Sequence, residues 1–154
     1  LYTAWLQKLE LEETRLALKG QTETNNAILS REAKNSFEQG FYRLLEIHRQ
    51  VFSSISTTAN NGSQRFGSDA LELFKPSLKA HNPNNDPASD FNNFYENFHP
   101  YISAYFSSFT NLVLSVENSN QINKSFYFDV IRSQLSAYEL FFIFYWGLSK
   151  HGVR

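Results

Sequence analysis

Five polar residues near the C-terminal end of the chain have the types and spacing that could hold a ligand or a partner. Arg132, Ser136 and Glu139 follow one another at intervals of four and three residues, so they share one strip of a continuous helix. About 10.5 Å of helical rise separates Arg132 from Glu139, so each is expected to meet a partner on a neighbouring helix. We favour a buried polar network that fixes helix packing, with a binding site as the alternative. The predicted binding residues are Arg132, Gln134, Ser136, Tyr138 and Glu139.

A second pair, Arg43 and His48, has the spacing of a known RNA-cleaving motif. The segment Arg43-Leu-Leu-Glu-Ile-His48 resembles the R-x4-H pattern of the HEPN-type helical ribonucleases, so these two residues are the candidate catalytic residues. On a regular helix, however, their side chains diverge by about 140°. We therefore favour a half-buried histidine with a hydrogen-bond partner and a solvated arginine.

Neither a metal nor a cofactor is expected. The chain has no cysteine, and its four histidines fall on separate predicted elements. We find no phosphate-binding loop, serine nucleophile motif or paired catalytic carboxylates. A formal net charge of -1 provides no general field for phosphate backbones, so nucleic acid is not an expected partner.

Helical periodicity dominates the first half of the chain. Good helix formers predict a long helix from Tyr2 to about Ser30, with Gly20 as a weak point. A second, core helix is indicated by apolar residues and one histidine at 4-3-4-3-4 spacing. These residues are Phe37, Phe41, Leu44, His48, Val51 and Ile55. A loop around Asn60-Asn61-Gly62 and Gly67 follows, and then a short helix from Ser68 that Pro76 is expected to bend or end.

Helices also fill the second half. The Pro- and Asn-rich stretch His81 to Ser89 predicts a break. Aromatic residues from Phe91 to Phe98 predict a helix, and Pro100 suits the first turn of a new one. A last helix is expected from about Lys124 to Ser149. No alternating strand pattern is found, so the predicted fold is all-α, an antiparallel helical bundle with a long N-terminal helix.

The segment Leu140 to Trp146 is apolar on every helical face, so it must be surrounded by other helices or by another chain. Phe141 and Phe144 are expected to be core or interface anchors. The run is far shorter than the ~20 apolar residues that a membrane-spanning helix needs.

Segments at both ends resemble the AbiC-like family of phage abortive-infection proteins. They are Leu6 to Lys19, Phe41 to Gln50 and Phe126 to Ser149, of which Arg132 to Leu140 is the most distinctive. The resemblance implies transmembrane helices just before a segment such as Leu1 to Lys19. It thus implies a soluble domain held at the cytoplasmic face of the bacterial inner membrane, where it restricts phage growth. Residues 1–30 are then a helical linker after an anchor outside this sequence, and residues 31–154 the helical abortive-infection domain. The family provides no settled catalytic residues.

The leading hypothesis is a non-enzymatic sensor or interaction domain, because the helices are rich in rings and no catalytic set converges. One alternative is a HEPN-like ribonuclease effector that uses Arg43 and His48. The other is a structural oligomerisation module. The expected partners are a phage or host protein, further copies of the chain, and the inner membrane through the anchor.

Overall fold

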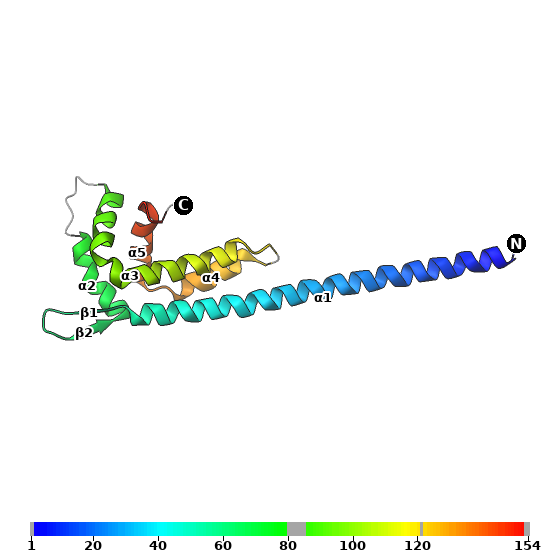
Figure 1. Cartoon of the computed structure of the whole chain (residues 1–154), viewed down its shortest axis with the longest axis horizontal. Helices are drawn as coiled ribbons and strands as arrows, with labels where there is room; N and C mark the ends of the chain where they lie inside the picture. Colours follow the sequence, from blue (N-terminus) through cyan, green and yellow to red (C-terminus); the bar gives the residue numbers. More distant parts are fainter. Residues whose placement is uncertain (1, 80–85, 121, 153–154) are drawn as a thin grey trace. The chain divides into compact units, whose positions relative to one another are not determined.

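The computed structural model describes residues 2–79, 86–120 and 122–152, without the side chains of residues 4 and 79. Over these residues it contains five α-helices and one short two-stranded sheet, so the predicted all-α class is confirmed (Figure 1). The chain divides into two compact units, Leu1–Gly40 and Phe41–Arg154. The candidate site lies entirely in the second unit. No helix in the described part of the chain is long and apolar enough to cross a membrane.

Helix α1 runs without interruption over Tyr2–Ser54, so the prediction of two separate helices is wrong. Gly20 lies inside it, which costs only about 1 kcal/mol relative to Ala and is outweighed by the many good helix formers on either side. Described side chains before residue 37 are exposed. Phe41, Leu45 and His48 are buried, so this last stretch of α1 contributes to the core of the second unit.

A β-hairpin follows α1 where the sequence indicated only a loop. Strands β1 (Ser56–Thr58) and β2 (Gln64–Phe66) pair antiparallel with Thr57 opposite Arg65. Three residues per strand are too few to produce a recognisable alternation of apolar and polar residues. Gly62 has a φ of 80° in the connecting turn, a conformation that glycine adopts without strain.

Helix α2 spans Gly67–Lys79 and continues past Pro76, which therefore does not end it. Helix α3 spans Pro87–Glu117 and likewise contains Pro100, so the two helices predicted on either side of Pro100 are one. Figure 1 shows that α3 is bent between its first part and the part that leads to α4. The bend has a physical cause, since a proline ring clashes with the carbonyl one turn earlier. Of the predicted break at 81–89, residues 81–85 lie outside the described residues, and Pro87 begins α3.

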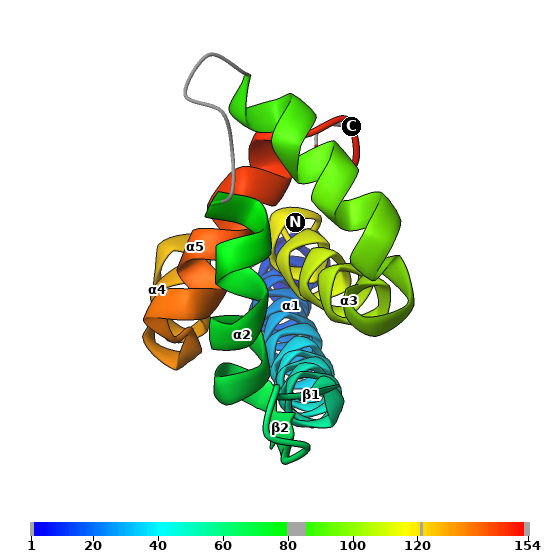
Figure 2. The same ribbon diagram turned by 90° about the vertical axis from the view of Figure 1, so that its left-hand side faces the viewer.

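The predicted C-terminal helix is in fact two helices. Helix α4 covers Lys124–Gln134 and α5 covers Ala137–Leu148, with extended backbone at Leu135 and Ser136 between them. Helix α4 returns antiparallel along α3 after a short connection (Figure 1). Helix α5 lies against α2 and α3 (Figure 2). Because the helix is interrupted, Arg132, Ser136 and Glu139 do not form the single strip expected from their spacing.

The core of the second unit is built mainly from rings of α3 and α5 with apolar side chains of α2. Phe91, Phe94, Tyr105 and Phe142 are among its fully or almost fully buried members. The segment Leu140 to Trp146 is only partly enclosed by this core. Phe142 is 1% exposed, but Leu140 is 44% and Phe144 62% exposed, so the other helices of this chain do not surround the segment. The alternative, that another chain covers it, stays a prediction.

Candidate functional site

A buried polar cluster joins three helices of the second unit. His48 comes from α1, Tyr105 and Ser108 from α3, and Glu139 from α5. The Nδ1 of His48 lies 2.8 Å from the Ser108 hydroxyl oxygen, and its Nε2 lies 4.0 Å from Oε1 of Glu139. The Tyr105 hydroxyl donates to the same Oε1 at 3.2 Å. Because His48 and Glu139 are each 3% exposed and Tyr105 is 1% exposed, no substrate can reach these groups in this conformation.

Glu139 is buried because it serves two helices at once. Its Oε2 accepts the backbone N–H of Ser136 at 2.8 Å, and its own N–H donates to the Ser136 hydroxyl at 3.2 Å. This reciprocal pair is a capping box, which satisfies backbone donors at the start of a helix. The second oxygen meets Tyr105, so both oxygens of the carboxylate accept hydrogen bonds.

The hydrogen bonds determine which ring nitrogen of His48 carries the proton. The single hydroxyl proton of Ser108 is donated to the backbone carbonyl of Tyr105 at 2.8 Å, so Nδ1 of His48 must be the donor to Ser108. Burial lowers the pKa of His48 from 6.5 to about 4, so the imidazole is neutral near pH 7. Burial, then the charge of Glu139 and the hydrogen bond to it, raise the pKa of Tyr105. The phenol therefore stays protonated and continues to donate.

The structure keeps most of the other predicted site residues apart. Arg43 is exposed on α1, away from the buried His48, and its side chain has no hydrogen bond or ion pair with a described residue. Arg132 and Gln134 are exposed at the end of α4. Tyr138 is half-buried against α2, with the Lys75 ammonium 5.3 Å from its ring centroid. Only Ser136 and Glu139 of the predicted binding set meet, and ligand binding by the set stays a prediction.

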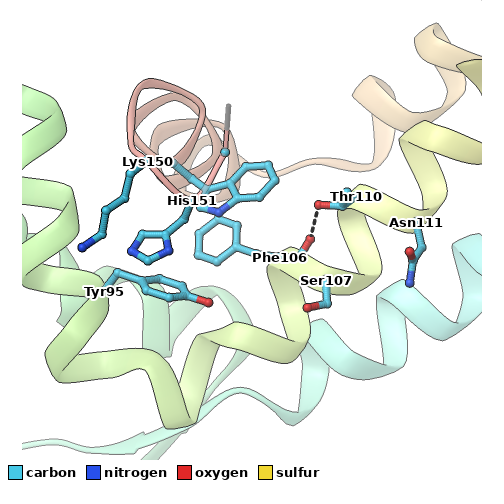
Figure 3. A pocket seen from close by; sticks show the side chains of 9 residues that line it. Tyr95, Phe106, Ser107, Thr110, Asn111, Lys150 and His151 are labelled. Atoms are coloured by element: carbon cyan, nitrogen blue, oxygen red, sulfur yellow. Dashed lines mark hydrogen bonds between the residues drawn. The ribbon is translucent and has the colours of Figure 1, made fainter. Parts of the chain in front are cut away.

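A pocket of about 350 Å³ lies elsewhere in the same unit, between the two arms of the bent helix α3 (Figure 3). Helix α3 contributes Tyr95, Phe106, Ser107, Thr110 and Asn111 to it. The end of α5 and the turn that follows it contribute Trp146, Lys150, His151 and Gly152.

Two ring pairs form the apolar part of the pocket. Phe106 and Trp146 stack with centroids 5.1 Å apart and an angle of 14° between their planes. Tyr95 and His151 face one another with centroids 4.4 Å apart, as Figure 3 shows. Each pair joins α3 to the C-terminal segment, so the pocket exists only while that segment is held in place.

A tight turn holds the C-terminal segment. The hydroxyl of Ser149, which is 1% exposed, donates to the carbonyl of Trp146 at 2.7 Å and accepts the N–H of His151 at 3.2 Å. The N–H of Gly152 donates to the carbonyl of Ser149 at 3.2 Å. A Cβ at position 152 would overlap the carbonyl of Trp146, so only glycine fits there.

Charge in the pocket comes from Lys150. Its ammonium lies 3.1 Å from a carboxylate oxygen of Glu96, and both side chains are more than half exposed, so water screens the pair. Burial first, and then the positive charge of Lys150, lower the pKa of His151. The Nε2 of His151 is buried and has no hydrogen-bond partner among the residues that the structure describes. None of the nine lining residues is acidic.

The sequence also contains one Glu-x2-His pair, Glu96 and His99, that our reading of the histidines as isolated overlooked. Such a pair can bind a metal when further ligands join it. Among the described residues, however, no group of three His, Cys, Asp or Glu side chains is arranged to hold a metal ion.

Sequence reasoning missed the pocket. The bend at Pro100 and the short turn from Ser149 to Gly152 create it, and neither leaves a recognisable motif. The available signals were the proline inside an apolar periodic segment and the glycine just beyond the last helix.

Comparison with known proteins relates the C-terminal part of the chain to a protein family. Residues 95–154 match the model of the family described as "Putative phage abortive infection protein" (putAbiC), which confirms the resemblance for this part of the chain. The match includes the distinctive segment Arg132 to Leu140, whereas Leu6 to Lys19 and Phe41 to Gln50 lie outside it. It also contains all nine residues that line the pocket. Neither the curated proteins nor the solved structures gave a match.

Proposed function

We propose that this chain, whose residues 95–154 match the abortive-infection family, is a non-enzymatic sensor or interaction domain in defence against phage. The family match supports the role in phage defence. The more specific assignment rests on the surface of α5 and on the burial of the groups that could otherwise act as catalysts.

The observation that carries the proposal is an exposed apolar stripe on α5, formed by Leu140, Phe144 and Leu148. They are 44%, 62% and 46% exposed, and their spacing of four residues places them on one face of the helix. The opposite face holds the buried Phe142 and Glu139. Clustered large apolar side chains that a single chain leaves in water are typical of protein interaction sites. The stripe lies within the family-matched segment.

The buried cluster supports this proposal because it fixes the position of the stripe. Glu139 ties α5 to α3 through Tyr105, and His48 packs beside both groups from α1. An interaction surface on a rigid helix binds with less loss of conformational entropy than one on a loop.

The ribonuclease alternative requires Arg43 and His48 to act on one phosphodiester. In this structure His48 is 3% exposed and its ring is enclosed by Tyr105 and Phe109, while Arg43 points to solvent on another side of α1. The arrangement therefore favours binding over cleavage. Incubation of the purified protein with total RNA, with and without infected-cell extract, tests this directly, and cleavage lost in His48→Gln would support the alternative.

The proposed partners are a phage or host protein and further copies of this chain. The location implied by the resemblance, the cytoplasmic face of the inner membrane, remains part of the proposal. Fractionation of cells that express the native protein tests it, and recovery with the peripheral or free proteins would contradict it.

Phage plating on cells that depend on this protein for protection tests the interaction surface. Phe144→Ser and Leu140→Ser should abolish or strongly reduce protection, because a hydroxyl in the centre of an apolar interface is costly to desolvate. Leu114→Ser is the matched control, since Leu114 is 47% exposed on α3 within the same matched segment. Circular dichroism should show unchanged helix content in all three variants.

Full protection by folded Phe144→Ser and Leu140→Ser would refute the proposal. Light scattering on the same variants identifies the partner. A lower mass than the parent assigns the stripe to contact between copies, whereas an unchanged mass with lost protection assigns it to a different protein.

A further inference from the structure

We propose that the pocket between the arms of α3 binds a nucleoside monophosphate. This inference is independent of the α5 stripe, because neither Leu140 nor Phe144 lines the pocket. It adds a small-molecule site to the proposed interaction domain. Its elements are a set of rings, a pair of free polar side chains and one ammonium group.

The size of the pocket limits the ligand. A volume of about 350 Å³ lies near the lower end of the range of ~300 to 1,000 Å³ found for small-molecule sites. A single base with its sugar and phosphate is of this size, whereas an oligonucleotide would extend well outside. A single lysine in a chain of net charge -1 also gives little attraction for a polynucleotide backbone.

The rings favour a planar ligand. Tyr95 and Trp146 are both half-buried, so each leaves part of its ring surface open at the pocket. The partner of each ring fixes its orientation, His151 for Tyr95 and Phe106 for Trp146. A base that stacks on a ring of fixed orientation gains contact area without the entropic cost of ordering that ring.

The polar wall favours a ligand with both donors and acceptors at its edge. Ser107 and Asn111 are one helical turn apart on α3, and their side chains have no hydrogen-bond partner among the described residues. An asparagine amide presents one acceptor and two donors, the combination that reads the edge of a base or holds a ribose hydroxyl.

The ammonium of Lys150 favours a phosphate on that ligand. Its present partner, Glu96, is 63% exposed and can turn to solvent when a doubly charged phosphate approaches. None of the nine described residues that line the pocket is acidic, so none opposes the anion. A mononucleotide could use the ring stacking, the polar wall and the ammonium group together. Free phosphate would use only the lysine, so the pocket fits a mononucleotide better.

Trp146 provides a built-in reporter. The chain has two tryptophans, so Trp5→Phe leaves Trp146 as the only indole and places the fluorescence signal at the pocket. Titration with AMP, GMP, CMP and UMP should quench or shift this fluorescence for at least one nucleotide at sub-millimolar concentration and raise the melting temperature. Adenosine or the matching nucleoside should bind about tenfold more weakly, and inorganic phosphate alone should give no saturable signal.

Two pairs of variants locate the binding. Lys150→Ala and Asn111→Ala should each weaken binding of the nucleotide about tenfold. The control for the first is Lys34→Ala, because Lys34 is 57% exposed and ion-paired to Glu38, much as Lys150 is 58% exposed and paired to Glu96. The control for the second is Asn97→Ala, an exposed asparagine outside the pocket. Both controls should bind as the parent does.

Three results would overturn the inference. One is the absence of any change in fluorescence and melting temperature with all four nucleotides at millimolar concentration. Another is binding that Lys150→Ala and Asn111→Ala leave unchanged, which would place the nucleotide elsewhere. The third is saturable binding of phosphate as tightly as of nucleotide, which would replace the proposed ligand by a simple anion.

Discussion

The Nε2 of His48 lies 4.0 Å from Oε1 of Glu139, and both side chains are almost completely buried. The contact joins the end of the long helix α1 to the start of α5. Because the Nδ1 proton of His48 is directed at Ser108, the lone pair of Nε2 faces the carboxylate, whose charge is satisfied by Tyr105 and by the backbone of Ser136. The folded structure therefore holds His48 in its neutral form.

Acid should destabilise the protein through His48. The pKa is about 4 in the folded chain and near 6.5 once the ring is exposed, so between these values only the unfolded state binds the proton. The free energy of unfolding should fall by about 2.5 kcal/mol between about pH 7.5 and pH 4.5 from this group alone. Urea unfolding at a series of pH values measures it.

The difference between two histidine variants isolates this contribution. His48→Gln should remove that part of the acid sensitivity, whereas His99→Gln, on an exposed residue of α3, should keep it. Identical pH profiles for the parent and His48→Gln would show that the buried imidazole does not titrate as described.

Glu139 should be far more sensitive to truncation than to loss of charge. Glu139→Ala leaves the buried hydroxyl of Tyr105 and the N–H of Ser136 without an acceptor and should cost about 3 to 5 kcal/mol. Glu139→Gln keeps one acceptor and should cost less. Glu117→Ala, at a 60% exposed partner of Lys124, should change stability by less than about 1 kcal/mol. Equal effects at positions 139 and 117, measured by urea unfolding, would contradict the structural role of the cluster.

From the sequence we could predict that the fold is helical and that the region around Glu139 contains buried polar groups. The sequence did not predict how the helices of this region are arranged. The periodicity of apolar residues indicated most of the helical residues. It divided α1 and α3 into two helices each, joined α4 to α5, and assigned residues 87–89 of α3 to a break. The break before Ser136 escaped notice because Ser-x-x-Glu is also compatible with the interior of a helix. Its role as a capping box depends on Glu139 being drawn into the core by Tyr105, a residue remote in sequence.

The sequence alone also could not predict the pocket or the exposed face of α5, because both depend on residues remote in sequence. Pro100 was read as part of the first turn of a new helix, but it lies inside α3. Whether a proline starts a helix or bends one depends on the packing of the residues on both sides. The apolar run from Leu140 to Trp146 suggested burial on every face, yet this chain covers only one side of α5. A pattern in a single sequence indicates whether a side chain favours burial. It does not indicate whether a neighbouring element is present to bury that side chain.

Two phenylalanines test whether α5 has one buried face and one exposed face. Phe142 is 1% and Phe144 62% exposed, although they are two positions apart. Phe142→Ala should cost about 3 to 5 kcal/mol by leaving a cavity in the core, whereas Phe144→Ala should change the stability of an isolated chain by less than about 1 kcal/mol. Urea unfolding at low protein concentration compares them. A large loss at Phe144 that is independent of protein concentration would mean that α5 is rotated relative to this description.

Two glycines near the end of the chain provide the last test. A Cβ at Gly147, inside α5, would meet no atom within 4 Å, so Gly147→Ala should stabilise the protein by about 0.5 to 1 kcal/mol through higher helix propensity. A Cβ at Gly152 would overlap the carbonyl of Trp146, so Gly152→Ala should force the terminal turn open at a cost of about 1 to 3 kcal/mol. His151 would then separate from Tyr95, and Trp146 fluorescence should move to longer wavelength as water enters the pocket. Parent-like stability and fluorescence in Gly152→Ala would show that the turn does not close the pocket.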